Sequence, residues 1–226
     1  MSTLSRVGEL ARQHDPDRFF TTLFAPAAAR PALWALYAFN HELVRAREAV
    51  REPMMAMIRL QWWREVVEGE AKRHEIATPL HEAIAAGALK QEDLLALIEA
   101  REEDLPDTGE GWVQFADRTA GMLAVAAGHA LGHSEVPGLR AAGTAYGGAG
   151  LLRNRALAGA KPLPALRAAV EAALADARAA KLPRGALPAA LPAVFAARDL
   201  QRERPVRHRA FGDKLAVTLA AATGRL

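Results

Sequence analysis

The sequence contains no cysteine among its 226 residues, and this absence removes several classes of protein at once. Disulfide frameworks, thiolate zinc sites and cysteine nucleophiles all need a residue that the chain does not have. The fold therefore does not depend on oxidation, which fits a reducing compartment.

Aromatic residues and strand patterns are also scarce. Phe, Trp and Tyr make up only 6% of the chain, while hydrophobic residues, mostly alanine and leucine, make up 51%. Apolar residues recur every three to four positions, and no segment alternates for long enough to indicate a strand. A chain of this length can bury one substantial core, so we expect a single all-α domain over residues 1–226.

Long apolar runs are absent as well. No run approaches the roughly 20 residues that cross a bilayer, and Met1 to Leu10 has no apolar segment behind a basic one. We therefore expect a cytoplasmic protein. The net charge of only +3 permits weak attraction to anionic lipids, phosphorylated ligands or acidic partners, but it specifies none of them. Nothing in the sequence supports a nucleic-acid partner.

Prolines, glycines and capping residues divide the chain into helices and connectors. For example, Pro26 interrupts the first helix and Gly87 closes another. The first expected helix begins near Pro16, and the later ones cover Arg30–Val50, Pro53–Glu68, Thr78–Gly87, Gln91–Leu105, a long segment to about Leu131, Leu139–Leu157, Ala165–Lys181 and Phe211–Ala222.

Six glycines fall inside two of these helices. A glycine in a helix interior costs up to about 1 kcal/mol relative to alanine, so a group of them needs a reason. They indicate either close helix packing or room for a ligand, and they are Gly121, Gly128, Gly143, Gly147, Gly148 and Gly150.

The segment from Asp17 to Glu68 carries the most specific pattern. It contains RFFTTLFAPAAARPALWALYAFNHELVRAREAV and then EPMMAMIRLQWWREVVEG. This sequence resembles the squalene/phytoene synthase family, and its Ala38–Leu43 run resembles the branch of complex I assembly factors. Similarity extends over most of residues 1–157, whereas residues 158–226 are compatible only in being helical.

The resemblance implies the all-α isoprenoid-synthase bundle. In that fold the helix that begins at Arg30 would face the helix that begins at Leu139 across a central cleft. Enzymes of the family condense two prenyl diphosphates. Aspartates four residues apart on the facing helices hold the Mg²⁺ ions that neutralise the diphosphates.

The aspartates of the first family motif are incomplete in this chain. Placed by Tyr37, the two acidic positions fall on Val44 and Glu48, so one ligand is missing. Arg45 and Arg47 add positive charge where a cation would bind, and this charge repels Mg²⁺.

The second motif lacks both of its acids. Placed by Gly143 and Arg153, its aspartate positions fall on Asn154 and Ala158, and its usual asparagine position falls on Gly150. The resemblance therefore implies a non-catalytic member without a cofactor, which acts through a protein partner or through an isoprenoid or lipid ligand.

The expected cleft supplies candidate ligand-binding residues, with none assigned as catalytic or metal-binding. Charged candidates also suit a solvated helix face with ion pairs. Likewise, Tyr37, Phe39, Trp62 and Trp63 either line a lipid-binding cavity or belong to an ordinary core. The candidates are Tyr37, Asn40, His41, Val44, Arg45, Glu48, Tyr146, Gly150, Arg153 and Asn154.

Two alternatives stay open. One is a prenyltransferase of the same family that binds Mg²⁺ through substitute ligands, and the other is a carrier of an apolar ligand. The substitute ligands would be Glu42, Glu48, Glu99, Glu102 and Glu103.

The basic stretch Arg198–Arg209 also has two interpretations. It suits peripheral contact with the inner membrane or with an acidic partner. Because Asp199 and Glu203 are interspersed, a solvated face is its default interpretation.

Overall fold

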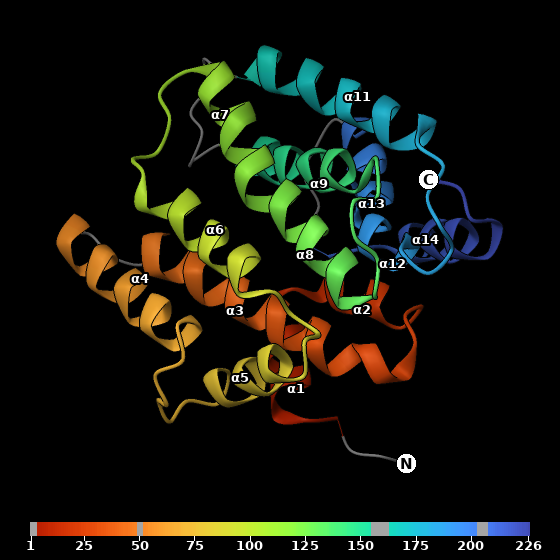
Figure 1. Cartoon of the computed structure of the whole chain (residues 1–226). Helices are drawn as coiled ribbons and strands as arrows, with labels where there is room; N and C mark the ends of the chain where they lie inside the picture. Colours follow the sequence, from red (N-terminus) through yellow and green to blue (C-terminus); the bar gives the residue numbers. More distant parts are fainter. Residues whose placement is uncertain (1–3, 49–51, 155–162, 203–207) are drawn as a thin grey trace. The chain divides into compact units, whose positions relative to one another are not determined.

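The structure is a computed structural model that describes residues 4–48, 52–154, 163–202 and 208–226 (Figure 1). Within these ranges the secondary structure is entirely helical, and no strand occurs. The all-α fold class is therefore confirmed. Contacts between Cα atoms gather the chain into two compact units, Met1–Asp104 with His129–Gly132 and Leu105–Gly128 with His133–Leu226. The single-domain organisation stays a prediction.

The first unit is organised around α3 (Arg30–Glu48), which contacts every other helical element of the unit. Its buried face carries Leu33, Leu36, Phe39 and Leu43, spaced three to four residues apart as in an amphipathic helix. The other elements are α1 (Arg6–His14), α2 (Pro16–Thr22), the 3₁₀ turn Ala27–Ala29, α4 (Pro53–Val67), α5 (Ala77–Ala85) and α6 (Gln91–Glu102).

Local capping explains where the first two helices begin. The Ser5 hydroxyl accepts a hydrogen bond from the Gly8 N–H at 3.3 Å and starts α1, which the sequence analysis did not predict. The Asp15 carboxylate accepts one from the Arg18 N–H at 3.2 Å and starts α2, with Pro16 in its first turn. The helix predicted near Pro16 is therefore confirmed.

Several predicted boundaries are wrong: α6 ends at Glu102 and not at Leu105, and α11 begins at Leu163 and not at Ala165. We expected Thr78 to cap a helix, but α5 already begins at Ala77, and no side chain caps it. The expected helix ends at Val50 and Leu157 lie outside the described residues.

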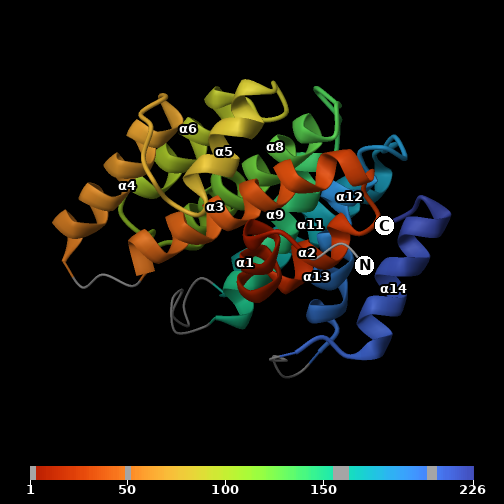
Figure 2. The same cartoon turned by 90° about the horizontal axis from the view of Figure 1, so that it is seen from below.

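The second unit is organised around α9 (Leu139–Arg153), which contacts α7, α11, α12, α13 and a π-helical turn. Figure 2 shows α14 beside α13 within this unit. The long helix expected up to Leu131 is present but contains the π turn, and its last residues, from His129, group with the first unit. The elements are α7 (Gly109–Ala116), the π turn Asp117–Gly121, α8 (Met122–Ala130), α11 (Leu163–Ala179), α12 (Leu187–Ala190), α13 (Pro192–Leu200) and α14 (Phe211–Thr223).

The glycines of α9 let neighbouring elements approach closely. A Cβ atom on Gly143 would lie 2.2 Å from the carbonyl oxygen of Ala120, and one on Gly147 would lie 2.4 Å from the Cβ of the same alanine. On Gly148 it would lie 2.5 Å from a methyl group of Val170. The close-packing interpretation is therefore confirmed for these three glycines.

Candidate functional site

The candidate residues on α3 differ in their access to solvent. Tyr37 and Asn40 are buried, His41 and Val44 are half-buried, and Arg45 is exposed. A single helix therefore divides the predicted set into core residues and residues that can meet a ligand from solvent. Only the latter remain candidates for direct contact in this unit.

Tyr37 belongs to the core. Its burial raises the pKa of the phenol above its ordinary value, so the hydroxyl stays protonated at neutral pH. The guanidinium of Arg18 lies 5.9 Å from the ring centroid. The core interpretation also holds for Phe39, which is fully buried.

Asn40 holds a buried arginine. A guanidinium nitrogen of Arg101 donates to the Asn40 side-chain oxygen at 2.7 Å, and another donates to the Leu97 carbonyl at 2.8 Å. A buried cation needs such acceptors because it has lost its water. Arg101 was not among the predicted site residues. Its spacing from Leu94, Leu97 and Ile98 nevertheless indicates a position on the buried face of α6.

His41 stacks on a second histidine. The imidazole rings of His14 and His41 have centroids 4.2 Å apart and planes 13° apart. Burial, followed by the charge of His14, lowers the pKa of His41 below its ordinary value. The two rings line a cavity of about 240 Å³ together with Arg6, Glu42 and Glu75.

A second cavity, of about 260 Å³, lies between α3, α4 and the segment before α5. Glu42 and Arg45 line both cavities, and Arg45 donates to Glu42 at 2.8 Å. Trp62, Trp63 and His74 form the aromatic lining of this second cavity. The centroid of the His74 ring lies 5.5 Å from that of Trp62 and 5.3 Å from that of Trp63. Trp62 and Trp63 thus line a cavity, and lipid binding there stays a prediction.

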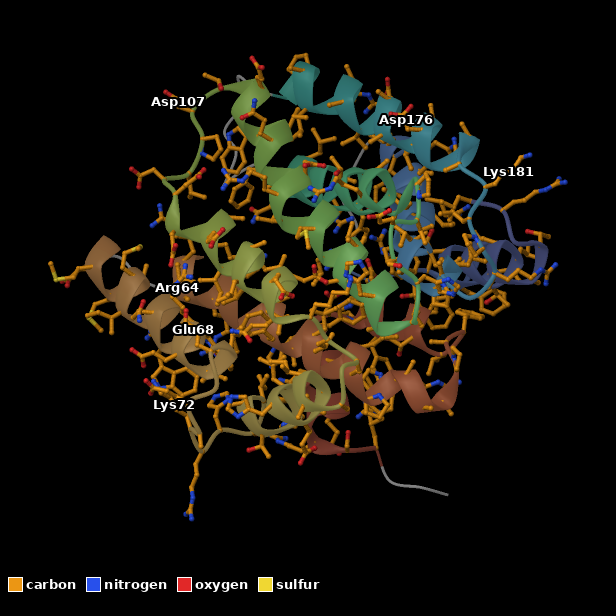
Figure 3. All side chains as sticks on the ribbon, in the orientation of Figure 1. Arg64, Glu68, Lys72, Asp107, Asp176 and Lys181 are labelled. Carbon is orange, nitrogen blue, oxygen red and sulfur yellow. The ribbon has the colours of Figure 1, made fainter. Side chains whose placement is uncertain are left out.

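The acids proposed as substitute metal ligands do not gather into a site. Glu42 pairs with Arg45, whereas two carboxylate oxygens of Glu102 accept hydrogen bonds from Arg64 at 2.8 and 2.9 Å (Figure 3). Glu99 lies 3.9 Å from the same guanidinium. Across the described side chains, no group of three histidine, aspartate or glutamate residues could hold a metal ion.

The side chain of Glu48 lies outside the described residues, so its predicted role stays a prediction. Glu103 has interactions of its own within the chain.

The candidates on α9 form a short row. Tyr146 is buried, and the guanidinium of Arg153 lies 5.9 Å from its ring centroid. A guanidinium nitrogen of Arg153 would lie 3.7 Å from a Cβ atom on Gly150, and Arg153 forms an ion pair with Asp199. Asn154 is exposed just beyond the helix. The structure thus brings Tyr146, Gly150 and Arg153 together, but a carboxylate of the chain already engages the arginine.

The described arginines of the basic stretch also face the chain's own carboxylates. Arg202 and Arg209 donate to Asp199 at 3.2 and 2.5 Å, and Arg198 and Arg202 both donate to Asp213. Burial by itself would raise the pKa of Asp213, but the hydrogen bonds from Arg198 and Arg202 outweigh it and hold that pKa below its ordinary value. Membrane contact by this stretch stays a prediction, and residues 203–207 lie outside the description.

The two sets of candidates belong to different units, so the cleft between α3 and α9 stays a prediction. Among the described helices, none is both long enough and apolar enough to span a bilayer.

Comparisons with solved structures agree with the fold. A ligand-bound dehydrosqualene synthase superposes with a TM-score of 0.69 at 9% identity and covers 96% of this chain and 94% of that chain. The squalene synthase HpnC from Alicyclobacillus acidocaldarius gives a TM-score of 0.59 at 19% identity and covers 96% of this chain and 92% of that chain. At these identities the likeness establishes the isoprenoid-synthase fold alone.

Curated relatives share sequence with part of the chain. Assembly factor 6 of NADH dehydrogenase (ubiquinone) complex I from Homo sapiens is 30% identical over 103 residues, which cover 44% of this chain and 31% of that protein. The Bos taurus protein is 29% identical over 123 residues, which cover 51% and 37%. The matches thus span about a third of the length of these relatives.

The squalene/phytoene synthase family model matches residues 11–156, which is more than half of the chain. This match includes both rows of candidate residues, on α3 and on α9. The chain belongs to the squalene/phytoene synthase family.

Proposed function

We propose that this chain is a non-catalytic member of its family and acts as an assembly factor by binding a protein partner. The relatives with shared sequence are named as assembly factors of complex I, which motivates the choice of partner. A prenyl diphosphate enzyme is the function that the proposal rejects.

The observation that carries the proposal is the charge around the first family motif. In the placement that the family resemblance implies, one acidic position falls on Val44, and Arg45 and Arg47 beside it are cations. Arg45 pairs with Glu42 at 2.8 Å, and Arg47 pairs with Asp104 at 3.1 Å. These acids neutralise arginines and so are poorly placed to recruit a metal ion. A protein surface tolerates such mixed charge.

The first experiment tests catalysis. The purified chain is incubated with farnesyl or geranylgeranyl diphosphate, with and without Mg²⁺, and diphosphate release is measured. The expected result is no release above the protein-free control. Metal-dependent release would overturn the proposal and restore the enzyme alternative.

The second experiment tests the partner. The tagged chain is recovered from cells of its own organism, and the bound proteins are quantified by mass spectrometry. Enrichment of complex I subunits over a tag-only control is expected. Recovery without any complex I subunit would contradict an assembly role, and a co-purified apolar small molecule in its place would favour the carrier alternative.

A further inference from the structure

We propose that the exposed face of α4 docks an amphipathic helix of a partner protein, one whose apolar face is bordered by carboxylates. This α4 surface consists of Met54, Met57, Ile58, Arg59 and Trp62. The inference rests on the proposed function and adds the location and the chemistry of the partner.

The α4 surface exposes several large apolar side chains to solvent. Met54 is 75% exposed, Ile58 is 55% exposed and Met57 is 40% exposed. Large apolar side chains that gather on one face mark interaction sites more often than isolated ones do. Methionine is unbranched and polarisable, so it adapts to the shape of a partner's side chains.

The apolar side chains of this surface follow the period of a helix. Exposed Met54 and Ile58 and half-buried Trp62 are four residues apart, so they form one stripe along α4. A second helix can pack its own stripe of apolar side chains against such a row. Lys72 lies beyond the end of α4, next to the last residue of the stripe (Figure 3). Its Nζ is 5.3 Å from the centroid of the Trp62 ring and forms an ion pair with Glu65.

The cavity of about 260 Å³ borders this stripe and contains donors without acceptors. Arg59 forms no hydrogen bond or ion pair with any residue that the structure describes. The indole N–H groups of Trp62 and Trp63 likewise donate no hydrogen bond to any of these residues. A partner that covered these donors would need to supply acceptors, because a buried donor left unpaired is costly. A carboxylate matches the guanidinium of Arg59 best.

The charges at the ends of α4 favour a helix over a membrane. Glu52 and Glu68 are both exposed, one at each end of α4. A flat anionic bilayer that reached Ile58 would also approach these two acids and be repelled by them. A helix can place its carboxylates beside Arg59 alone.

Site-specific photocrosslinking tests the occupant. A photoreactive phenylalanine analogue replaces Met57 in the full chain, and crosslinks formed in cells are mapped to peptides. The expected product is a complex I subunit, linked through an amphipathic helix with aspartate or glutamate beside its apolar face. Crosslinks to lipid, to a second copy of this chain or to a segment without acids would overturn the proposal.

Two pairs of variants test the chemistry through recovery of complex I subunits. Arg59→Glu should lower recovery roughly tenfold, in the range of one close charge pair, while Arg59→Lys should keep most of it. Arg73→Glu is the matched control, because Arg73 is exposed and also has no partner among the described residues. Likewise, Met54→Ser/Ile58→Ser should lower recovery, whereas Leu23→Ser, at an exposed leucine elsewhere, should not.

The outcomes separate the two proposals. If the unmodified chain recovers complex I subunits and the α4 variants recover them equally well, the docking surface is wrong and the assembly role stands. If the unmodified chain recovers none, both are overturned.

Discussion

The rings of His14 and His41 stack with their centroids 4.2 Å apart, which joins α1 to α3 through two groups that can both carry a proton. Burial, with the charge of His14, lowers the pKa of His41. The unfolded chain therefore binds more protons than the folded chain just below the ordinary histidine pKa of 6.5. The stability that the neutral form of His41 contributes is fully present above that value and is lost as the pH falls through the folded pKa of His41.

We therefore expect the melting temperature to fall between pH 7.5 and pH 5.5, and to fall less in a His14→Gln variant. Removing His14 removes the positive charge that opposes protonation of His41. His208→Gln is the control, since His208 is an exposed histidine elsewhere. Thermal unfolding at the two pH values measures the difference. An equal fall in the His14 variant and the unmodified chain would contradict the coupling.

The hydrogen bond from Arg101 to Asn40 should be important for stability. Asn40→Leu removes the acceptor at 2.7 Å and leaves a buried guanidinium under-satisfied. The expected loss is about 1.5–3 kcal/mol, as for hydrogen bonds to charged groups. Urea denaturation measures it, with the exposed Asn154→Leu as control, expected to change by no more than about 0.5 kcal/mol. Equal effects at the two positions would sink the prediction.

Two glycines on α9 should respond oppositely to alanine. A Cβ on Gly143 would lie 2.2 Å from the backbone oxygen of Ala120, which no rotamer change can relieve. We expect Gly143→Ala to destabilise the fold by about 1–3 kcal/mol. At Gly150 the nearest atom is 3.7 Å away, in the flexible Arg153 side chain, so Gly150→Ala should stabilise by up to about 1 kcal/mol. Chemical denaturation of both variants decides whether the signs differ.

Asp213 should contribute to stability in acid. Its folded pKa lies below the ordinary 3.8, so its contribution is present above that value and is lost as the pH falls through the folded pKa. Asp213→Asn should therefore unfold more easily near neutral pH and show a shallower further loss between about pH 5 and pH 3. Asp176→Asn, at an exposed position on α11 (Figure 3), is the control. A slope unchanged by Asp213→Asn would refute the assignment.

Helices with strong local signals could be predicted from the sequence. The starts of α3, α4 and α14 at Arg30, Pro53 and Phe211 match the predicted residues. By contrast, α1 was missed although Ser5, Val7 and Leu10 carry a cap and helical spacing. The signal was present but short. The π turn has no local signature that distinguishes it from a continuing α-helix.

The candidate site was harder to predict, because tertiary contacts assemble it. Trp62 and Trp63 could be identified as candidates from their spacing, but Arg59 and His74 join the same cavity only through the packing of α3, α4 and the segment before α5. Similarly, the arginines near the C-terminus appeared as a surface stretch. Their real partners include Asp213, which lies on the next helix and shows no pattern with them in the sequence.

The close contact between Gly143 and Ala120 also limits how the family can diverge at this point. Glycine is already the smallest residue, so a larger neighbour cannot be accommodated by shrinking the residue on α9. Any compensating change must come from the opposite side, and there the contact atom is a backbone oxygen, which every amino acid has. Relatives that lack this glycine must therefore hold the two helical segments further apart, and the spacing of the backbones should change with that one position.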